Sequence, residues 1–258
     1  MAELAALLAL ALAAVAALLW RERRASALLR RRLDAMALEQ QQLQQSCARL
    51  APAGLVQRLA SERDEDLAEH KQVTALFADL VGYTALSEKL EAPQLARVLN
   101  GYFERAADTI TAHRGHVSTF LGDGILAYFG ALEPNPWQCN DAVRAAVALR
   151  EALRSYSEEL QREGLPAVSV GIGIHRGIGL TGLIGSRDRR EYTVVGRTVN
   201  LAARVQGLTR LLGSDILITA EVKAELDPSI PLQAMPAQAV KGITEPVVTY
   251  AVLAPPSA

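Results

Sequence analysis

A tight turn at Gly122-Asp123-Gly124 separates two short apolar runs, at residues 116–120 and 125–129. A turn of this composition between two such runs is a strong sequence signal for a β-hairpin. The hairpin commits the middle of the chain to antiparallel strands, and the other elements have to be arranged around it.

Strands and helices occur in mixed order on both sides of this hairpin. Additional strands are predicted at residues 73–79, 168–175, 178–184, 192–195 and 216–218, and near Val240 and Val247. Helices are predicted at residues 93–113 and 138–163, after Gly196, and from Ala220. Mixed hairpins and helices of this kind predict an α+β fold, in which helices pack against one sheet.

The composition limits the class of protein. Half of the residues are hydrophobic, which is enough for a sizeable core. The 27 Lys and Arg residues nearly cancel the 28 Asp and Glu residues, so we expect no nucleic acid among the partners. The two cysteines, Cys47 and Cys139, form no Cys-x-x-Cys pattern, which argues against a disulfide scaffold and a cysteine-built zinc site.

The N-terminal segment has the features of a membrane anchor. Residues 4–20 carry no charged or polar side chain and end on Trp20, and an arginine-rich stretch follows. A helix of that length spans about 25 Å, the short end of what a bilayer core requires. The positive-inside rule predicts a single-pass anchor at residues 1–20 in the cell (inner) membrane, with the remaining chain in the cytoplasm. The alternatives are a cleaved signal peptide, whose basic N-terminal region is missing here, and a buried core helix.

Residues 21–51 carry a heptad pattern. Its apolar seam, with one polar member, consists of Leu29, Leu33, Met36, Gln40, Leu43, Cys47 and Leu50. The seam favours a parallel coiled coil that joins two chains, over a single amphipathic helix packed on its own domain. A Pro-Ala-Gly segment then ends the helix, and acidic residues favour a linker at 52–72. A globular domain at 73–252 and a tail at 253–258 complete the chain.

Two carboxylates, Asp79 and Asp123, each lie at the end of a predicted strand and close to a glycine. If the two strands are neighbours, the carboxylates converge at one edge of the sheet. Two Asp side chains and a free backbone carbonyl suit hard cations such as Mg²⁺ or Mn²⁺, which act in phosphoryl chemistry. The turn at residues 80–84 leads into a helix and offers backbone N–H groups to phosphates. Taken alone, an Asp beside a glycine is more often a turn residue than a ligand.

Three longer strings contain these residues: Phe-Ala-Asp-Leu-Val-Gly-Tyr-Thr at 77–84, Phe-Leu-Gly-Asp-Gly-Ile-Leu-Ala-Tyr-Phe-Gly at 120–130, and Tyr-Thr-Val-Val-Gly-Arg-Thr-Val-Asn-Leu-Ala-Ala-Arg at 192–204. Together they resemble the catalytic domain of class III nucleotidyl cyclases, over residues 73–252. The resemblance implies a ferredoxin-like βαββαβ core that works as a head-to-tail homodimer with active sites at the interface. It implies an enzyme that turns a nucleoside triphosphate into a 3′,5′-cyclic nucleotide and pyrophosphate.

The resemblance also implies catalytic roles for particular residues. Asp79 and Asp123, with the Leu80 carbonyl, would bind two divalent metal ions, Mg or Mn. Asn200 and Arg204 of the other chain lie at i and i+4 on one helix face. They would orient the ribose and stabilise the charge that develops at the α-phosphate.

Six positions are implied to bind the phosphates: Val81, Gly82, Tyr83, Thr84, Arg187 and Lys241. Arg187 follows Gly185-Ser186, where the family often has a basic residue. Lys241 belongs to the closing Lys-Gly segment, in which Ile243 replaces the family's second Lys.

The base is implied to be read by Thr119 and Thr193. Family adenylyl cyclases usually have Lys at the first position and Asp or Thr at the second, whereas guanylyl cyclases have Glu at the first. A Thr hydroxyl both donates and accepts hydrogen bonds. We expect an adenylate cyclase in intracellular signalling, with ATP as the favoured substrate. The alternatives are a guanylate or other nucleotide cyclase, and a degenerate, non-catalytic nucleotide-binding module.

Overall fold

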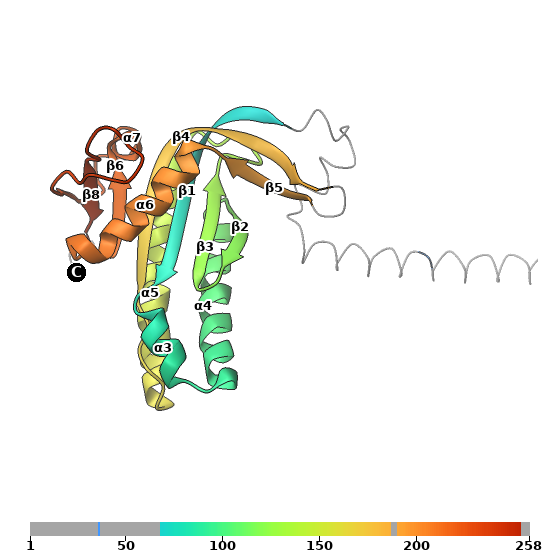
Figure 1. Cartoon of the computed structure of the whole chain (residues 1–258), viewed down its shortest axis with the longest axis vertical. Helices are drawn as coiled ribbons and strands as arrows, with labels where there is room; N and C mark the ends of the chain where they lie inside the picture. Colours follow the sequence, from blue (N-terminus) through green and yellow to red (C-terminus); the bar gives the residue numbers. More distant parts are fainter. Residues whose placement is uncertain (1–35, 37–67, 187–189, 254–258) are drawn as a thin grey trace, which may run out of the picture. The chain divides into compact units, whose positions relative to one another are not determined.

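The computed structural model describes Met36 and residues 68–186 and 190–253 (Figure 1). The chain divides into two compact units, Met1–Gln57 and Arg58–Ala258.

The predicted membrane anchor, at residues 1–20, lies outside the described residues. Of the predicted coiled coil at 21–51, only Met36 is described, as a helical and exposed residue. Among the residues that the structure describes, no helix has the length and apolar character needed to cross a membrane.

The second unit is a mixed α+β domain. Its described elements are, in chain order, β1 (Glu69–Leu80), α3 (Tyr83–Lys89), α4 (Ala92–Ala112), β2 (Gly115–Leu121), β3 (Gly124–Phe129), α5 (Gln138–Arg162), β4 (Val170–Gly185), β5 (Arg190–Val195), α6 (Arg197–Leu212), β6 (Ile216–Thr219), α7 (Ala220–Lys223), β7 (Leu232–Ala234) and β8 (Thr249–Val252). The strands form one sheet in the order β2-β3-β1-β4-β6-β8-β7, and β5 pairs with β4. The predicted βαββαβ core is confirmed as β1-α4-β2-β3-α5-β4, with the predicted hairpin at its centre.

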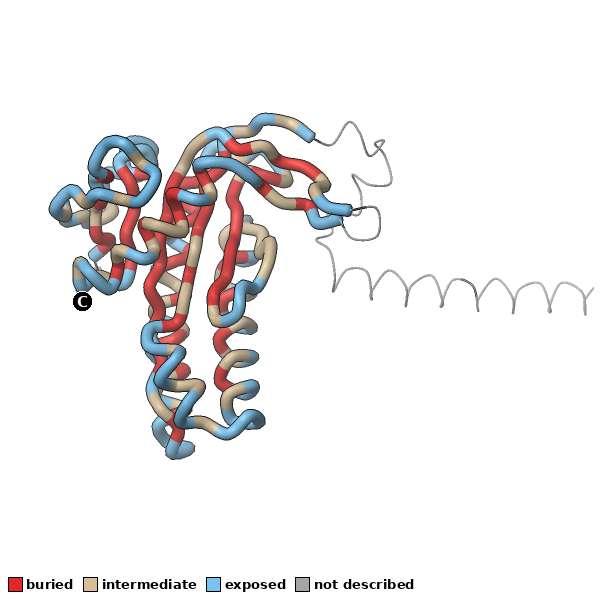
Figure 2. Tube along the Cα trace, in the orientation of Figure 1, coloured by how far each residue is buried: buried red, intermediate tan, exposed pale blue. Residues whose placement is uncertain are grey.

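Strand β1 is among the mostly buried strands at the middle of the sheet (Figure 2), and its two faces belong to different parts of the core. Leu76, Ala78 and Leu80 belong to the larger hydrophobic cluster, which includes residues of α4 and α5. Val73 and Ala75 alternate with them along the strand, so they lie on the opposite face, in a cluster with Ala202 of α6. Helices α4 and α5 therefore cover one face of the sheet, and α6 covers the other (Figure 1).

Alternating glycines on β4 allow α6 to lie very close to the sheet. A Cβ on Gly173 would overlap the backbone of Gln206, and a Cβ on Gly177 would lie 2.6 Å from Thr198 Oγ1. Side chains alternate between the two faces of a strand, so these two glycines leave the α6 face of β4 without bulk. This close approach determines which face of α6 meets the sheet and which face points away.

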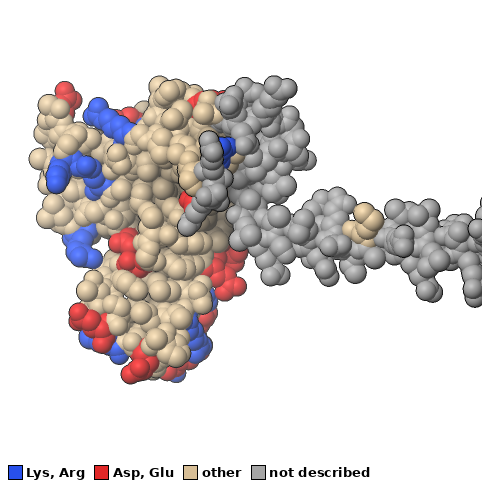
Figure 3. Space-filling view, turned by 45° about the vertical axis from the view of Figure 1, so that its right-hand side comes forward, with Lys and Arg blue, Asp and Glu red and all other residues tan. Residues whose placement is uncertain are grey.

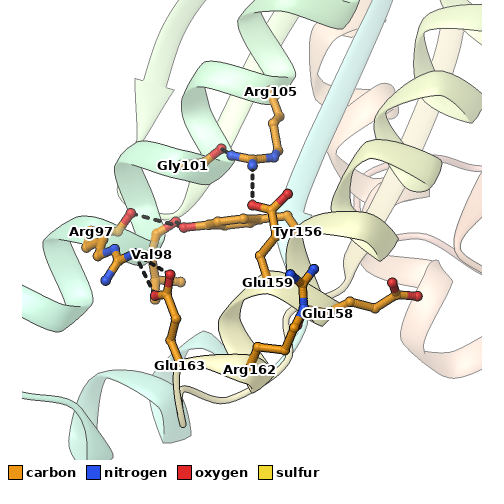
Figure 4. Close-up of polar contacts among 9 residues, drawn as sticks. All are labelled: Arg97, Val98, Gly101, Arg105, Tyr156, Glu158, Glu159, Arg162 and Glu163. Carbon is orange, nitrogen blue, oxygen red and sulfur yellow. Dashed lines mark hydrogen bonds and ion pairs between the residues drawn. The ribbon is translucent and has the colours of Figure 1, made fainter.

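Helices α4 and α5 are joined by contacts around Tyr156, drawn in Figure 4. The Tyr156 hydroxyl donates to the Arg97 carbonyl at 3.2 Å, and the Arg105 guanidinium lies 3.9 Å from the centre of the Tyr156 ring. Arg105 also forms a 2.8 Å ion pair with Glu159. A Cβ on Gly101 would collide with the Tyr156 ring, so only glycine permits this packing. The two long helices are thereby held in register beneath the sheet.

The structure corrects the predicted strand pair at residues 168–175 and 178–184. These residues form one continuous strand, β4 (Val170–Gly185). Residues 175–177 interrupt the apolar pattern, but they pair with residues 73–75 of β1, so the ladder runs through them. Long-range pairing with the central strand outweighs the local pattern.

Two further predictions in this unit are wrong in detail. Strand β1 begins at Glu69, inside the segment 52–72 that was predicted as a linker. The strand predicted near Val247 is confirmed as β8, which begins two residues later at Thr249, but Val240 lies in no strand and the other late strand is β7, Leu232–Ala234. Val247 itself forms an isolated bridge with Gln238. Both valines instead pack in a cluster with Leu201 of α6, so their apolar side chains cover a helix and do not form a sheet edge.

Candidate functional site

The structure brings Asp79 and Asp123 together at one edge of the sheet. Strands β1 and β3 are antiparallel neighbours, and Asp79 pairs with Gly124, the residue after Asp123. The pair Leu121–Gly124 closes the hairpin around a two-residue turn. Gly122 has φ +67°, in the left-handed region that favours glycine, so the tight turn that presents Asp123 depends on it.

The two carboxylates strongly affect each other. Burial, followed by the charge of Asp123 and a side-chain hydrogen bond with it, raises the pKa of Asp79 to about 6, and Arg210 opposes the shift. Two carboxylates held this close are costly as a dianion unless a cation lies between them. The Leu80 carbonyl, from the next residue of β1, is a further hard oxygen donor at this edge.

The donor set fits magnesium or manganese. The described residues contain no group of three or more His, Cys, Asp or Glu side chains that could hold a metal. Two carboxylates and a carbonyl leave most coordination positions to water and to phosphate oxygens, which is how proteins usually bind Mg²⁺. The site is therefore suited to a cation that arrives with, or is completed by, a triphosphate.

Tyr102 of α4 was not predicted as a site residue. Its hydroxyl is buried and has no hydrogen-bond partner in the structure. Burial, together with the charges of Asp79 and Asp123, raises its pKa well above the usual value, so the phenol stays protonated. It is a hydrogen-bond donor within electrostatic reach of both carboxylates. No sequence signal distinguishes Tyr102 from an ordinary core tyrosine.

The predicted phosphate-binding turn needs one correction. The Val81 N–H donates to the Ser169 carbonyl at 2.9 Å, so this amide is already used in holding β1 against the segment before β4. Gly82 has φ +75° and precedes α3, which begins at Tyr83. The N–H groups at the start of a helix lack intrahelical partners, so those of Tyr83 and Thr84 are the better candidates.

Asn200 and Arg204 lie on the face of α6 that points away from the sheet. Thr198 and Ala202 face β4 and the core, and in a helix of about 3.6 residues per turn positions 200 and 204 lie on the opposite side. No described hydrogen bond or ion pair connects Asn200 or Arg204 to Asp79. One chain therefore does not bring these two groups of predicted site residues together.

Arg204 instead lies beside the closing Lys-Gly segment of its own chain. A Cβ on Gly242 would be 3.6 Å from Arg204 Nη2, and Gly242 has φ +74°. Lys241 is exposed next to it. The structure thus gathers Asn200, Arg204 and Lys241 on one surface and the two carboxylates on another. Arg187 lies outside the described residues.

Of the two predicted base-reading residues, Thr193 has hydroxyl neighbours that the sequence did not indicate. Thr193 of β5 is contacted by Ser118 of β2, with 3.3 Å between the hydroxyl oxygens, and the structure shows no hydrogen bond between Thr193 and Thr119. The β2–β3 register shifts between Val117 and Thr119, which marks a β-bulge at Ser118. Tyr128 of β3 also contacts Thr193, at 3.4 Å. Sequence reasoning missed Ser118 and Tyr128 because a bulge leaves no clear trace in the residue pattern.

Comparison with proteins of known sequence identifies relatives of the second unit. The family profile of the adenylate and guanylate cyclase catalytic domain matches residues 66–254. An adenylate cyclase of Anabaena cylindrica is 35% identical over 189 residues, covering 70% of this chain and 37% of that protein. Adenylate cyclase 1 of Rhizobium meliloti (strain 1021) is 28% identical over 183 residues, covering 71% of this chain and 28% of that protein. The chain thus spans about a third of the length of these curated relatives.

Two solved structures are similar to the domain over most of their length. The guanylyl cyclase Cya2 is 34% identical with a TM-score of 0.68, covering 72% of this chain and 93% of that one. The adenylyl cyclase CyaB from P. aeruginosa is 29% identical with a TM-score of 0.69, covering 73% of this chain and 96% of that one. The first of these structures is named a guanylyl cyclase and the second an adenylyl cyclase, so overall similarity does not indicate which base this chain prefers. That preference depends on the residues that would contact the base.

Proposed function

The chain belongs to the family of the adenylate and guanylate cyclase catalytic domain, and from this premise we propose that it is an adenylate cyclase that converts ATP to 3′,5′-cyclic AMP and pyrophosphate. The observation that carries the proposal is that Asp79 and Asp123 lie close together at the sheet edge. A bound cation would offset the repulsion between their two carboxylates. The relatives named adenylate cyclase support ATP as the substrate.

Asp79, Asp123 and the Leu80 carbonyl are the residues that would hold two divalent cations, Mg²⁺ or Mn²⁺. When bound, such cations supply positive charge at the triphosphate and make the ribose 3′-hydroxyl easier to deprotonate. The N–H groups of Tyr83 and Thr84 are placed to bind phosphate oxygens, because they open α3 directly after the carboxylate-bearing strand. Arg187 and Lys241 would add positive charge for the terminal phosphates.

A homodimer would complete the active site. Asn200 and Arg204 point away from the carboxylates of their own chain, so a second copy has to supply them. The Arg204 guanidinium of that copy would stabilise the negative charge that develops at the α-phosphate, and Asn200 would orient the ribose.

Exposed apolar side chains beside the carboxylates support this arrangement. Val81, Phe120 and Leu121 are between 49% and 51% exposed and flank the two Asp residues in sequence. Exposed apolar groups of this kind are typical of surfaces that pair with another protein. Figure 3 shows one face of the domain, on which a broad uncharged area separates small groups of charged side chains.

The N-terminal segment would attach this dimer to the cell membrane. The uncharged stretch at 4–20 and the arginines that follow it support a single-pass anchor with the catalytic domain in the cytoplasm. The heptad pattern within 21–51 supports a coiled coil that joins two chains and transmits a signal to their catalytic domains.

The test is a product assay on the purified full chain, with Mn²⁺ or Mg²⁺ and with ATP, GTP, CTP and UTP in parallel. Cyclic AMP should be the main product, and Asp123→Ala should reduce it by at least about a hundredfold, since one of two cation-binding carboxylates is lost. Asp108→Ala, which removes an exposed carboxylate from α4, is the control and should leave the rate unchanged.

Each other outcome has a defined meaning. Substantial activity in the Asp123→Ala variant would remove the metal assignment. Cyclic GMP as the main product would keep the mechanism and change the substrate, a result that the 34% identity to Cya2 makes the second candidate. A folded dimer that turns over no triphosphate would mean a nucleotide-binding module without catalysis.

A further inference from the structure

Three hydroxyl groups from three different strands meet at the predicted base-reading position. Ser118 Oγ of β2 lies 3.3 Å from Thr193 Oγ1 of β5, and the Tyr128 hydroxyl of β3 lies 3.4 Å from the same atom. The Tyr128 hydroxyl also donates to the Val194 carbonyl at 3.0 Å. The bulge at Ser118 is what directs its side chain toward Thr193, because the register of β2 shifts there.

The carbonyl at the end of this chain of contacts determines the direction of every hydrogen bond in it. A carbonyl oxygen can only accept, and a phenol has a single proton, so Tyr128 uses that proton on Val194. The Tyr128 oxygen can then only accept from Thr193, and Thr193 in turn can only accept from Ser118. All three protons therefore point inward, toward the Val194 carbonyl.

The protonation state of Tyr128 is consistent with this order. Burial raises the pKa of the phenol, while its hydrogen bonds to Thr193 and Val194 oppose the shift. The phenol therefore keeps its proton throughout the physiological range. The two contacts to Thr193, at 3.3 and 3.4 Å, are longer than the usual separation of two hydrogen-bonded hydroxyl oxygens.

We infer that these three hydroxyls form a relay that makes Ser118 and Thr193 a hydrogen-bond acceptor site, which selects adenine through its C6 amino group. With their protons turned inward, Ser118 Oγ and Thr193 Oγ1 present lone pairs to a bound base. Adenine offers N–H donors at C6, whereas guanine and hypoxanthine offer a carbonyl oxygen that these lone pairs would repel. The inference rests on the proposed function, and it names Ser118 as a further residue that contacts the base and Tyr128 as the residue that positions Thr193.

The relay also accounts for base selection without a lysine. At the position of Thr119 the family's adenylyl cyclases usually have a lysine, which donates a hydrogen bond to adenine. A hydroxyl cannot sort purines while it is free to rotate, because it both donates and accepts. Fixing the proton of Thr193 on Tyr128 removes that ambiguity.

The experiment compares ATP with inosine triphosphate, whose base has a carbonyl oxygen at C6 in place of the amino group and an N1–H where adenine N1 is an acceptor. The ratio of kcat/KM for ATP to that for inosine triphosphate is measured for the full chain and for Tyr128→Phe and Ser118→Ala. We expect each variant to lower the ratio about tenfold, which is the loss of one oriented hydrogen bond. Tyr156→Phe is the matched control, because it removes a tyrosine hydroxyl from the α4–α5 contact and should leave the ratio unchanged.

A second readout separates failure of this inference from failure of the proposed function. Affinities for non-cyclisable ATP and inosine triphosphate analogues are measured by calorimetry, which requires no turnover. If the wild-type preference for the adenine analogue is lost in Tyr128→Phe, the relay is supported even in an inactive protein. If Tyr128→Phe and Ser118→Ala melt like the wild type but keep its full preference in both assays, the relay does not select the base. A wild-type protein that prefers the C6-carbonyl nucleotide would overturn the inference as well.

Discussion

Replacing Asp123 with Asn should stabilise the metal-free protein at neutral pH while removing its response to metal. Asp79 has a pKa of about 6 in the folded protein, against a usual value of 3.8. Between pH 3.8 and 6, its carboxyl group is therefore mostly protonated in the folded protein and mostly ionised in the unfolded chain. For a carboxyl group whose pKa is raised by folding, stability is fully present below the unfolded pKa. It falls as the pH rises through the window from 3.8 to 6 and stays lower above it.

The magnitude follows from the causes of the shift. A shift of two units corresponds to about 3 kcal/mol in the limit of full burial. Asp79 is only partly buried, so solvent screening reduces this free energy. The charge of Asp123 is the second cause of the raised pKa, after burial. An uncharged amide in place of the Asp123 carboxylate should therefore recover about 1 kcal/mol of folding free energy. For a domain of this size that is about 2–4 °C in Tm.

The assay is thermal unfolding of the wild type and Asp123→Asn at pH 5 and pH 7.5, with EDTA and with Mn²⁺. In EDTA the variant should melt higher than the wild type at pH 7.5, and the difference should shrink at pH 5, where Asp79 is protonated in the folded state. Mn²⁺ should raise the Tm of the wild type and have little effect on the variant. An Asp123→Asn protein that is no more stable than the wild type at pH 7.5 without metal would refute the argument that the two carboxylates repel each other.

Two other predictions concern the second copy of the chain and the packing of α6 against the sheet. Co-expressed Asp79→Ala and Arg204→Ala chains should recover about a quarter of wild-type activity. Half of the randomly formed dimers contain one chain of each kind, and each of these dimers has one intact site out of two. Activity no higher than in either variant alone would exclude an interfacial site. Gly173→Ala should lower the free energy of unfolding by about 3 kcal/mol or more in a denaturant titration, because its methyl group would overlap the backbone of Gln206. Gly207→Ala, on the same helix with no atom within 4 Å of the added Cβ, should instead stabilise by up to about 1 kcal/mol, and equal effects of the two changes would contradict the packing described for α6.

Much of the fold follows from patterns that are local in sequence. The turn at 122–124 and the long helices at 92–112 and 138–162 were predicted close to their observed bounds, because turn chemistry and helical periodicity act over a few residues. The convergence of Asp79 and Asp123 was also predictable in outline, since each lies at the end of a strand and antiparallel neighbours bring such ends together.

Other features were decided by contacts between distant segments. Strand β4 runs without a break through residues 175–177 because β1 pairs with it along its length, which no local pattern indicates. The outward position of Asn200 and Arg204 depends on the glycines of β4, about twenty to thirty residues earlier, which set the face of α6 that meets the sheet. The hydrogen bond from the Val81 N–H to the Ser169 carbonyl also joins segments that are far apart in the chain.

The amino-acid sequence by itself determined which chemical groups the proposed site can draw on: two strand-end carboxylates, a helix-borne Asn and Arg, and threonine hydroxyls. Only the tertiary structure decided how these groups face one another. It placed the carboxylates and Arg204 on separate surfaces, and it put Ser118, not Thr119, against Thr193. The physical reason is that register, bulges and helix seating are set by packing between segments far apart in the chain, where a shift of one residue turns a side chain to the other face.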